Sequence, residues 1–459
     1  MSSTSPNTLL YELEQKIPAA TALFCACQHL LASVVGIITP PLIIGSALGM
    51  NAYLPYLISM SLLASGIGTF LQAHRFKGIG AGMICLQGTS FAYVGVIISG
   101  GMWMKGQGAS SEQILAMIFG VNFIAALIPI LVSQFIEPLK KIFTPIVTGT
   151  VITLIGISLI KVSMLNWGGG VHAEHFGSPM QLILGAVTLG VIILLNRLDN
   201  QYIRLSAIMI GIIAGCLLAA WSGEFHFKPI TVDHWITVPE LFRFGFSFSW
   251  TLFVPIALVS VIALIEAVGD LTANCMISHQ PIDNAAFRTR LKGGIFGDGL
   301  NCMIAAMLGS FPNTTFAQNN GVIQMTGVAS RRVGRYIGVL LILLGLFPGL
   351  GAIVEQIPPA VLGGATLVMF GSVIAAGIRI ITQSPLGRRE MLIVALSFGL
   401  GLGIQAVPDI LGQFPTIISN LFGSAVTAGG ITAIVLSLFL PQEHTSSAPA
   451  VHSSVRVKN

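Results

Sequence analysis

The sequence predicts an all-α polytopic membrane protein with 14 transmembrane spans in two inverted seven-span repeats. The composition, the spacing of the apolar runs and the placement of the basic residues lead to this prediction. Of the 459 residues, 54% are hydrophobic and only 8% are charged, whereas a soluble globular protein carries about 25% charged residues. A soluble enzyme of this composition would expose too much apolar surface to stay dispersed. The net charge of +5 is spread over the predicted loops, so no nucleic-acid partner is expected.

The spans are predicted from apolar runs that are bounded by polar residues, proline or glycine. About 20 apolar residues are enough for a helix to cross the lipid bilayer. The runs lie at 20–48, 53–72, 79–100, 113–135, 143–164, 179–196, 203–222, 246–272, 293–310, 316–328, 334–354, 359–381, 389–404 and 412–440. The last run is long enough to form two pieces. We expect the stretches 85–92 and 313–322 to be broken rather than continuous helices.

Basic residues concentrate in every second predicted loop, and this fixes the orientation. The positive-inside rule places Lys and Arg on the cytoplasmic side, so an even number of spans with both termini inside accounts for the pattern. These loops and the termini hold Lys16, Arg75, Lys77, Lys140, Lys141, Arg197, Arg204, Arg288, Arg290, Lys292, Arg331, Arg332, Arg335, Arg379, Arg388, Arg389, Arg456 and Lys458. The opposite side receives only Lys105, Lys161, Lys228 and Arg243. Segments 1–19 and 441–459 are therefore predicted to be cytoplasmic.

The two halves of the chain echo each other. Residues 88–92 (Gly-Thr-Ser-Phe-Ala) are matched by 313–317 (Asn-Thr-Thr-Phe-Ala), and 145–149 (Pro-Ile-Val-Thr-Gly) by 359–363 (Pro-Ala-Val-Leu-Gly). The two matches are separated by similar lengths of chain, which indicates two repeats. Secondary transporters built from inverted repeats bind their substrate near the midplane, where broken helices meet. We predict that the repeats cover residues 20–230 and 245–440.

Three acids lie inside apolar runs, where a charged side chain costs several kcal/mol and needs an explanation. Glu266 and Asp270 are one helical turn apart and share a face, and Asp298 lies between two glycines. Two ionised acids on one face repel each other, which favours a proton on one of them. A protonatable carboxyl that faces an aqueous cavity suits proton coupling, and an interhelical structural hydrogen bond is the alternative. His29, early in the first run, could bond substrate or a carboxylate, or tie two helices together.

Segment 311–327 is unusually polar for its surroundings. Pro312 and Gly321 weaken helix formation, and between them lie Asn313, Thr314, Thr315, Gln318, Asn319 and Asn320. Side-chain amides offer a donor and an acceptor together, which suits a neutral planar heterocycle with amide-like edges. A helix that starts near Gly321 would direct its positive N-terminal dipole at the same site.

The matching segment of the first half, from Gln87 to Phe91, is also polar and interrupted by glycine. It contains Ser90, and the ring of Phe91 could lie against a flat ligand. The alternative for both polar segments is that their side chains serve helix packing.

Enzyme and metal signatures do not appear in the sequence. We find no phosphate-binding loop, no nucleophile elbow and no His and Cys cluster with metal-ligand spacing, so we expect neither an enzyme nor a bound metal or other cofactor. All six cysteines are expected to be small buried hydrophobes: Cys25, Cys27, Cys85, Cys216, Cys275 and Cys302.

Residues 318–327 (Gln-Asn-Asn-Gly-Val-Ile-Gln-Met-Thr-Gly) resemble the signature of the nucleobase/ascorbate transporter family, the nucleobase–cation symporters of the xanthine/uracil permease type. That signature is Gln or Glu, Asn, any residue, Gly, four variable positions, Thr, then Arg, Lys or Gly, and the match is full. Residues 266–270 (Glu-Ala-Val-Gly-Asp), the Gln-His pair at 28–29 and the Gln-Gly-Thr-Ser-Phe of 87–91 also resemble the bacterial xanthine permeases. The resemblance covers roughly residues 8 to 441.

The resemblance implies a fold and a set of functional residues. Spans 1–4 and 8–11 would form a core domain, spans 5–7 and 12–14 a gate domain, and short antiparallel strands would occupy broken spans 3 and 10. Glu266 would bond the base, and Gln318 would read its other edge. Phe91, Phe316 and Ala317 would line the pocket. Positions important for binding or coupling would be His29, Asp270, Asp298 and Asn319.

These observations lead to one functional hypothesis with open alternatives. We expect a proton-coupled importer of a purine nucleobase, xanthine first, in the inner membrane, with a homodimer implied by the resemblance. Ser90 stands where some xanthine-selective members carry Asn, so uric acid or a broader purine range stays open. A uracil symporter of the same fold is one alternative. A passive channel for a small neutral solute is another, although a channel does not need the buried acids.

Overall fold

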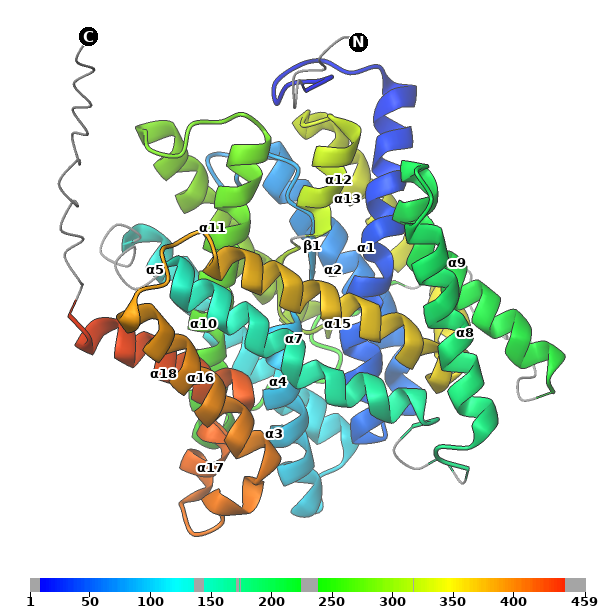
Figure 1. The fold of residues 1–459 in the computed structure, drawn as a ribbon, viewed down its shortest axis with the longest axis vertical. Coiled ribbons are helices and arrows are strands. Elements are labelled where there is room, and N and C mark those ends of the chain that lie inside the picture. Colours follow the sequence, from blue (N-terminus) through cyan, green and yellow to red (C-terminus); the bar gives the residue numbers. More distant parts are fainter. Residues whose placement is uncertain are drawn as a thin grey trace, which may run out of the picture.

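The computed structural model describes residues 9–135, 144–170, 173, 175–223, 238–316 and 318–441. Ala317 lies outside these residues, as do the loop and tail residues Lys140, Lys141, Lys228, Arg456 and Lys458. The described chain is almost entirely helical (Figure 1). Eight helical segments in this part of the chain are long and apolar enough to cross a membrane. The fold is therefore that of a multi-pass membrane protein.

The elements fall into two halves of similar composition. The first half contains α1 (Ala19–Leu48), η1 (Asn51–Tyr53), α2 (Leu54–His74), β1 (Gln87–Thr89), η2 (Phe91–Tyr93), α3 (Val94–Gly106), α4 (Ser111–Ala125), α5 (Leu127–Val132), η3 (Ser133–Phe135), α7 (Pro145–Trp167), α8 (Pro179–Asn196) and α9 (Gln201–Trp221). The second half contains α10 (Trp250–Ile277), α11 (Ala285–Leu308), β2 (Asn313–Thr315), α12 (Gln318–Thr326), α13 (Arg331–Gly345), α14 (Pro348–Glu355), α15 (Pro359–Ile381), α16 (Arg388–Ala406), η4 (Pro408–Leu411), α17 (Thr416–Phe422) and α18 (Ala425–Phe439).

Local sequence signals explain where several helices begin and end. The hydroxyl of Ser110 accepts from the backbone N–H of Gln113, whose side chain returns a bond to Ser110, so α4 begins with a capping box. Pro145 occupies the first turn of α7, where its missing N–H costs nothing. Gly49 ends α1 with a φ of 71°, a left-handed conformation that glycine adopts without strain.

Proline corrects one predicted span and introduces a break in another, which remains a single candidate span at Ser111–Phe135. The run 334–354 was expected to form one helix, but α13 ends at Gly345 and α14 begins at Pro348. Pro348 forces Phe347 into an extended conformation with ψ 95°, which breaks the helix. In the run 113–135, α4 ends at Ala125, four residues before Pro129, because the proline cannot bond to that carbonyl.

Two further expectations are settled near the broken segments. The helix expected to start near Gly321 is α12, which begins slightly earlier, at Gln318, and includes this glycine. The last run does form two pieces, α17 and α18, which meet at Gly423 and Ser424.

One group of helices packs in the same pattern twice. Helix α7 lies along α15. Helix α8 contacts α9 and α15, and α16 correspondingly contacts α18 and α7. Helices α7 and α15 touch through their backbones, since a Cβ on Gly149 would come within 2.6 Å of the Gly377 carbonyl. Figure 1 shows α7 and α15 running side by side across the molecule. This duplicated packing is the pattern expected of a repeat.

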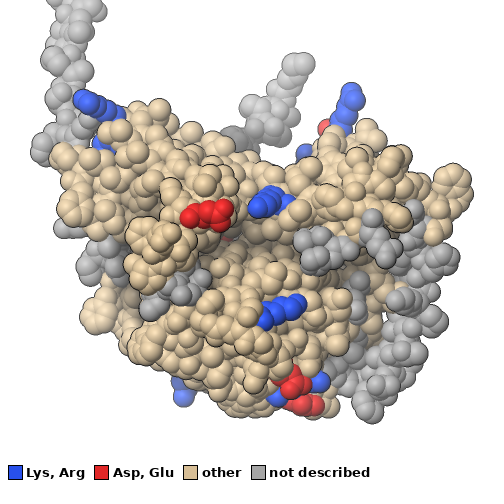
Figure 2. Space-filling view, turned by 90° about the horizontal axis from the view of Figure 1, so that it is seen from below, with Lys and Arg blue, Asp and Glu red and all other residues tan. Residues whose placement is uncertain are grey.

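A second group surrounds the two strands. Helix α2 packs on α13, α11 packs on α4 and α5, and α1 contacts α2, α3, α12 and α13. The strands β1 and β2 pair antiparallel, with Gln87 opposite Thr315 and Thr89 opposite Asn313. The face shown in Figure 2 carries few charged side chains.

Candidate functional site

The site is built where the two broken segments meet. Pairing of β1 with β2 places the two matched sequence segments side by side, and two bonds extend the pairing at its ends. The backbone N–H of Ser90 donates to the Pro312 carbonyl at 2.9 Å, and that of Phe316 donates to the Leu86 carbonyl at 2.9 Å. Residues that are far apart in the sequence, such as Phe91 and Phe316, therefore lie on one surface. Ser90 is buried, and its hydroxyl accepts from the Ala92 N–H at 3.3 Å, which caps η2.

Two phenylalanine rings lie next to each other in this region. The rings of Phe91 and Phe316 are nearly parallel, with centroids 6.4 Å apart and 21° between their planes. The ring of Phe316 rests against two backbones, because a Cβ on Gly36 of α1 or on Gly88 of β1 would overlap it. Glycine at these positions lets the ring reach its place. Phe91 and Phe316 thus form a buried aromatic surface.

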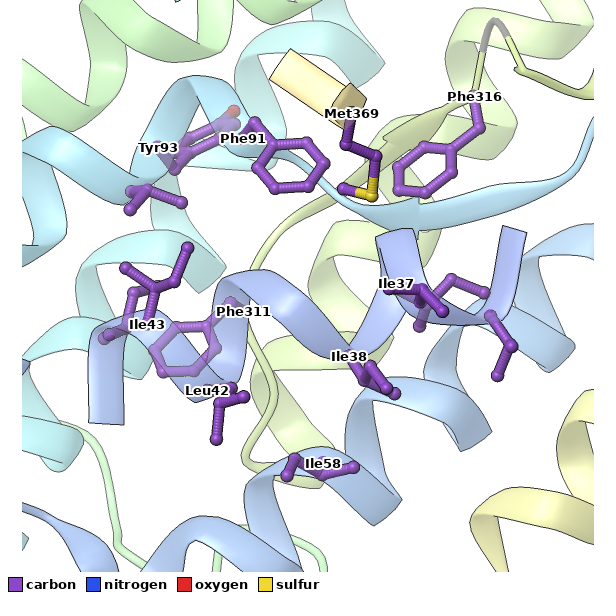
Figure 3. Close-up of a cluster of buried hydrophobic side chains, with 14 of the residues drawn as sticks. Ile37, Ile38, Leu42, Ile43, Ile58, Phe91, Tyr93, Phe311, Phe316 and Met369 are labelled. Atoms are coloured by element: carbon purple, nitrogen blue, oxygen red, sulfur yellow. The ribbon is translucent and has the colours of Figure 1, made fainter. Parts of the chain in front are cut away.

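Helix α15 supplies two residues that the sequence did not single out. The ring of Phe370 meets Phe91 edge-on, with centroids 5.3 Å apart. The side chain of Met369, 4% exposed, points between the rings of Phe91 and Phe316 in Figure 3. Both residues lie in an ordinary apolar run, so no sequence signal distinguishes them from other buried side chains.

The acids of α10 have few partners. Glu266 is half-buried, Asp270 is 4% exposed, and one carboxyl oxygen of each is buried without a hydrogen-bond partner among the described residues. Glu266 and Asp270 lie one helical turn apart on α10, so their side chains share one face of the helix. A carboxyl with an unused acceptor can take a donor from a ligand or from solvent. Glu266 and Asp270 are therefore free to exchange partners.

Asp298 is held very differently. Its Oδ1 accepts from Gln72 Nε2 at 2.6 Å, from Gln87 Nε2 at 2.7 Å and from the Thr315 hydroxyl at 3.3 Å. These donors come from α2, β1 and β2, while Asp298 itself lies on α11. The carboxyl thus joins four elements. Gln72 is not among the site residues predicted from the sequence, although a glutamine at the end of an apolar run was a signal that could have found it.

His29 and Asn319 lie together. His29 is fully buried on α1, next to Asn319 at the start of α12. The Asn319 amide donates to the Ile84 carbonyl at 2.5 Å, and Asn274 donates to the same carbonyl at 2.7 Å. These contacts fix the beginning of α12 against the chain that leads into β1. Gln318 begins α12, but the structure describes only its backbone.

The cysteines are partly as expected. Cys25, Cys85, Cys275 and Cys302 are buried, whereas Cys216 is half-buried and Cys27 is exposed, which corrects the expectation that all six are buried. Within the described ranges, no three His, Cys, Asp or Glu side chains are grouped to hold a metal ion.

A polar, aromatic and partly unpaired region between broken helices of a multi-span fold is the arrangement in which secondary transporters place their substrate sites. The Xan_ur_permease model, described as a permease family, matches residues 20–410, and the chain belongs to this family. The xanthine permease XanP of Escherichia coli K12 is 43% identical over 449 residues, which cover 96% of this chain and 97% of XanP. The xanthine permease XanQ of the same organism is 44% identical over 440 residues, 95% of this chain and 94% of XanQ.

Another relative is named for a different purine. The uric acid permease PucK of Bacillus subtilis is 35% identical over 439 residues, which cover 95% of this chain and 99% of PucK. Among solved structures, the transmembrane domain of a cyanobacterial bicarbonate transporter, BicA, superposes with a TM-score of 0.58 at 14% identity, over 91% of this chain and 96% of that one. A murine Slc26a9 anion transporter in the inward-facing state gives 0.60 at 11% identity, over 92% of this chain and 68% of that one. At such identities the structures support the fold alone.

Proposed function

We propose that the chain is a proton-coupled symporter that imports a purine nucleobase, xanthine first, by alternating access. The observation that carries this proposal is the identity of 43% and 44%, over nearly the whole chain, to two proteins named xanthine permeases. The buried site agrees with it, because it combines a flat aromatic surface with unpaired acids and an amide-rich helix start.

Each residue of the proposed site makes a different contact with the base. Glu266 accepts hydrogen bonds from ring N–H groups, and Gln318 bonds a carbonyl and an adjacent N–H. Phe91, Phe316 and Ala317 lie against the ring, while Ser90 and His29 complete the pocket. Two amide-type pairs, at about 1 to 1.5 kcal/mol each and more with a charged partner, together with ring stacking suffice for micromolar affinity.

Coupling is assigned to the acids around the site. Asp270 lies beside Glu266 with an unpaired oxygen, so a proton on either relieves their repulsion. Asp298 and Asn319 support the site, since both are held by hydrogen bonds to neighbouring elements. Uptake of substrate and proton together would then be driven by the proton gradient.

We propose that the protein has 14 spans in two inverted repeats. Core spans 1–4 and 8–11 surround the paired strands, and gate spans 5–7 and 12–14 include α7, α8, α9, α15, α16 and α18. The duplicated contacts of α8 and α16 support this division. We further propose a homodimer in the inner membrane with both termini cytoplasmic, on the resemblance and the alternation of basic loops.

Uptake of radiolabelled xanthine in a strain that lacks its own transporters tests the function. Accumulation that is lost with a protonophore and competed by unlabelled xanthine is expected. A panel of competing bases separates xanthine from uric acid, which the relative named uric acid permease favours as the second candidate. Competition by uracil alone would indicate a pyrimidine symporter. Equilibration without accumulation would indicate a passive channel and refute the symporter.

A further inference from the structure

Residues 9–17, which precede α1, form a strap across one end of the molecule. We call this segment the N-terminal strap. It pairs with the turn between α12 and α13: the Leu10 N–H donates to the Gly327 carbonyl at 2.7 Å, the Ala329 N–H to the Tyr11 carbonyl at 2.9 Å, and the Arg331 N–H to the Leu13 carbonyl at 3.0 Å. Figure 1 shows it beside α12 and α13.

Side chains reinforce this backbone pairing. The Ser330 hydroxyl donates to the Gln15 carbonyl at 2.7 Å, and Arg331 forms an ion pair with Glu14 at 2.7 Å. The ion pair is largely exposed, so its contribution is small. The Ser330 hydroxyl therefore bonds to the strap and does not cap α13.

The strap also enters the apolar interior. Leu13 is 2% exposed and belongs to a cluster with Met83 and Cys85 of the chain leading into β1, Leu271 and Cys275 of α10, and Leu291 of α11. One buried leucine thus connects the strap to the elements that carry Glu266 and Asp298. In contrast, Leu10 of the same strap is 70% exposed.

The strap meets α12 at its last turn. Helix α12 has nine residues, and a helix this short takes its stability from its surroundings. Its start is fixed by Asn319 on the Ile84 carbonyl and by Asn320 on the Asp270 carbonyl. Its end turns at Gly327, with φ 67°, and the Gly327 carbonyl points to the strap. The strap is therefore the second of two anchors for the helix that begins with Gln318.

We propose that the N-terminal strap is a positioning element of the substrate site, which holds α12 against α10 and against the chain leading into β1. The proposal rests on the proposed function, because it assigns the strap a role in purine binding through α12. Loosening the strap leaves the site residues present but lets α12 shift, so substrate affinity falls before the turnover of bound substrate does.

The test compares two identical substitutions in the strap. Leu13→Asp places a charge in the buried cluster, and Leu10→Asp is the matched control at an exposed position. In xanthine uptake, we expect Leu13→Asp to raise KM about tenfold, equivalent to about 1.4 kcal/mol, with Vmax per transporter within about twofold. Leu10→Asp should keep the wild-type KM. Leu13→Ala, which removes the packing without adding charge, should move KM in the same direction if the Asp variant fails to insert.

A second readout needs no substrate. Cys275 is 1% exposed and shares the cluster with Leu13, whereas Cys27 is exposed. Purified protein is treated with N-ethylmaleimide, and the labelled cysteines are identified by mass spectrometry. We expect Cys27 to react in all variants, and Cys275 to react only in Leu13→Asp and, more slowly, in Leu13→Ala.

The outcomes separate the two proposals. Rapid labelling of Cys275 in the wild type, or its continued protection in Leu13→Asp, would show that the strap does not close the buried cluster. Labelling in Leu13→Asp with an unchanged KM overturns its role in the site. If the wild type takes up no xanthine at all, the proposed function fails, while the labelling pattern still decides whether the strap closes the cluster.

Discussion

Substitution of Gly88 by alanine tests whether the aromatic surface is built as described. The added methyl would lie 2.7 Å from Cε1 and Cε2 of Phe316 and nearer still to Cζ. The ring has little room to move toward α1, because it already lies close to the backbone of Gly36. An added Cβ at Gly36 would be only 2.9 Å from the Cε2 atom of the ring. Overpacking of this kind costs about 1–3 kcal/mol. The variant should therefore unfold at a lower temperature than the wild type.

The same substitution should weaken binding. A displaced Phe316 loses its contact with a flat ligand, which is worth about 0.5–1.5 kcal/mol beyond simple burial. We therefore expect KM for xanthine to rise about twofold to tenfold. The assay is xanthine uptake together with thermal unfolding of the purified protein.

Two further glycines provide a graded comparison. Gly36→Ala brings one ring atom of Phe316 within 3 Å, so its effects should be smaller than those of Gly88→Ala. Gly95→Ala is the control, because its nearest neighbour is the Ser424 hydroxyl at an ordinary 3.4 Å. In both assays the effect must be largest for Gly88→Ala, smaller for Gly36→Ala and smallest for Gly95→Ala. If Gly88→Ala behaves like Gly95→Ala, the ring does not rest on β1 and the reasoning is wrong.

Three other substitutions address the remaining parts of the site. Glu266→Gln keeps the shape but removes the ionisable group, so concentrative uptake should be abolished, and unchanged pH-dependent accumulation would refute its role. Gln318→Asn shortens the amide by one methylene, so binding should weaken or the preferred base should change, as competition with purine analogues will show. Met369→Ala opens space between Phe91 and Phe316, so uptake of xanthines with an added methyl group should improve relative to xanthine; the exposed Met391→Ala on α16 should leave this ratio unchanged.

Much of the fold follows from local patterns in the sequence. Apolar runs locate the long helices, and the polar interruptions at 85–92 and 313–322 locate the two broken segments, which contain β1 and β2. The weak match between 88–92 and 313–317 was informative, because these matched segments are the ones that pair. The error at Pro348 and the helix break at Pro129 arise where one residue divides a run whose hydropathy is continuous.

The parts of the site that escaped prediction depend on long-range packing. Gln72 contacts Asp298 across more than two hundred residues of chain, and Met369 reaches the rings from a helix late in the sequence. Leu13 lies outside the predicted spans, so hydropathy gave no signal of its burial. Hydropathy and spacing indicate the secondary structure and burial of each segment by itself. They do not indicate which segments will pack against each other.

The hydrogen bonds around the three acids distinguish their roles more clearly than their positions in the sequence do. Asp298 accepts from amide and hydroxyl donors on α2, β1 and β2, and these bonds join the two halves of the chain. Glu266 and Asp270 each keep an oxygen without a partner in the described structure, so a proton there costs no such contact. Under the proposed symport mechanism, Glu266 and Asp270 of α10 can take a proton without losing such contacts, while Asp298 holds the paired strands in place.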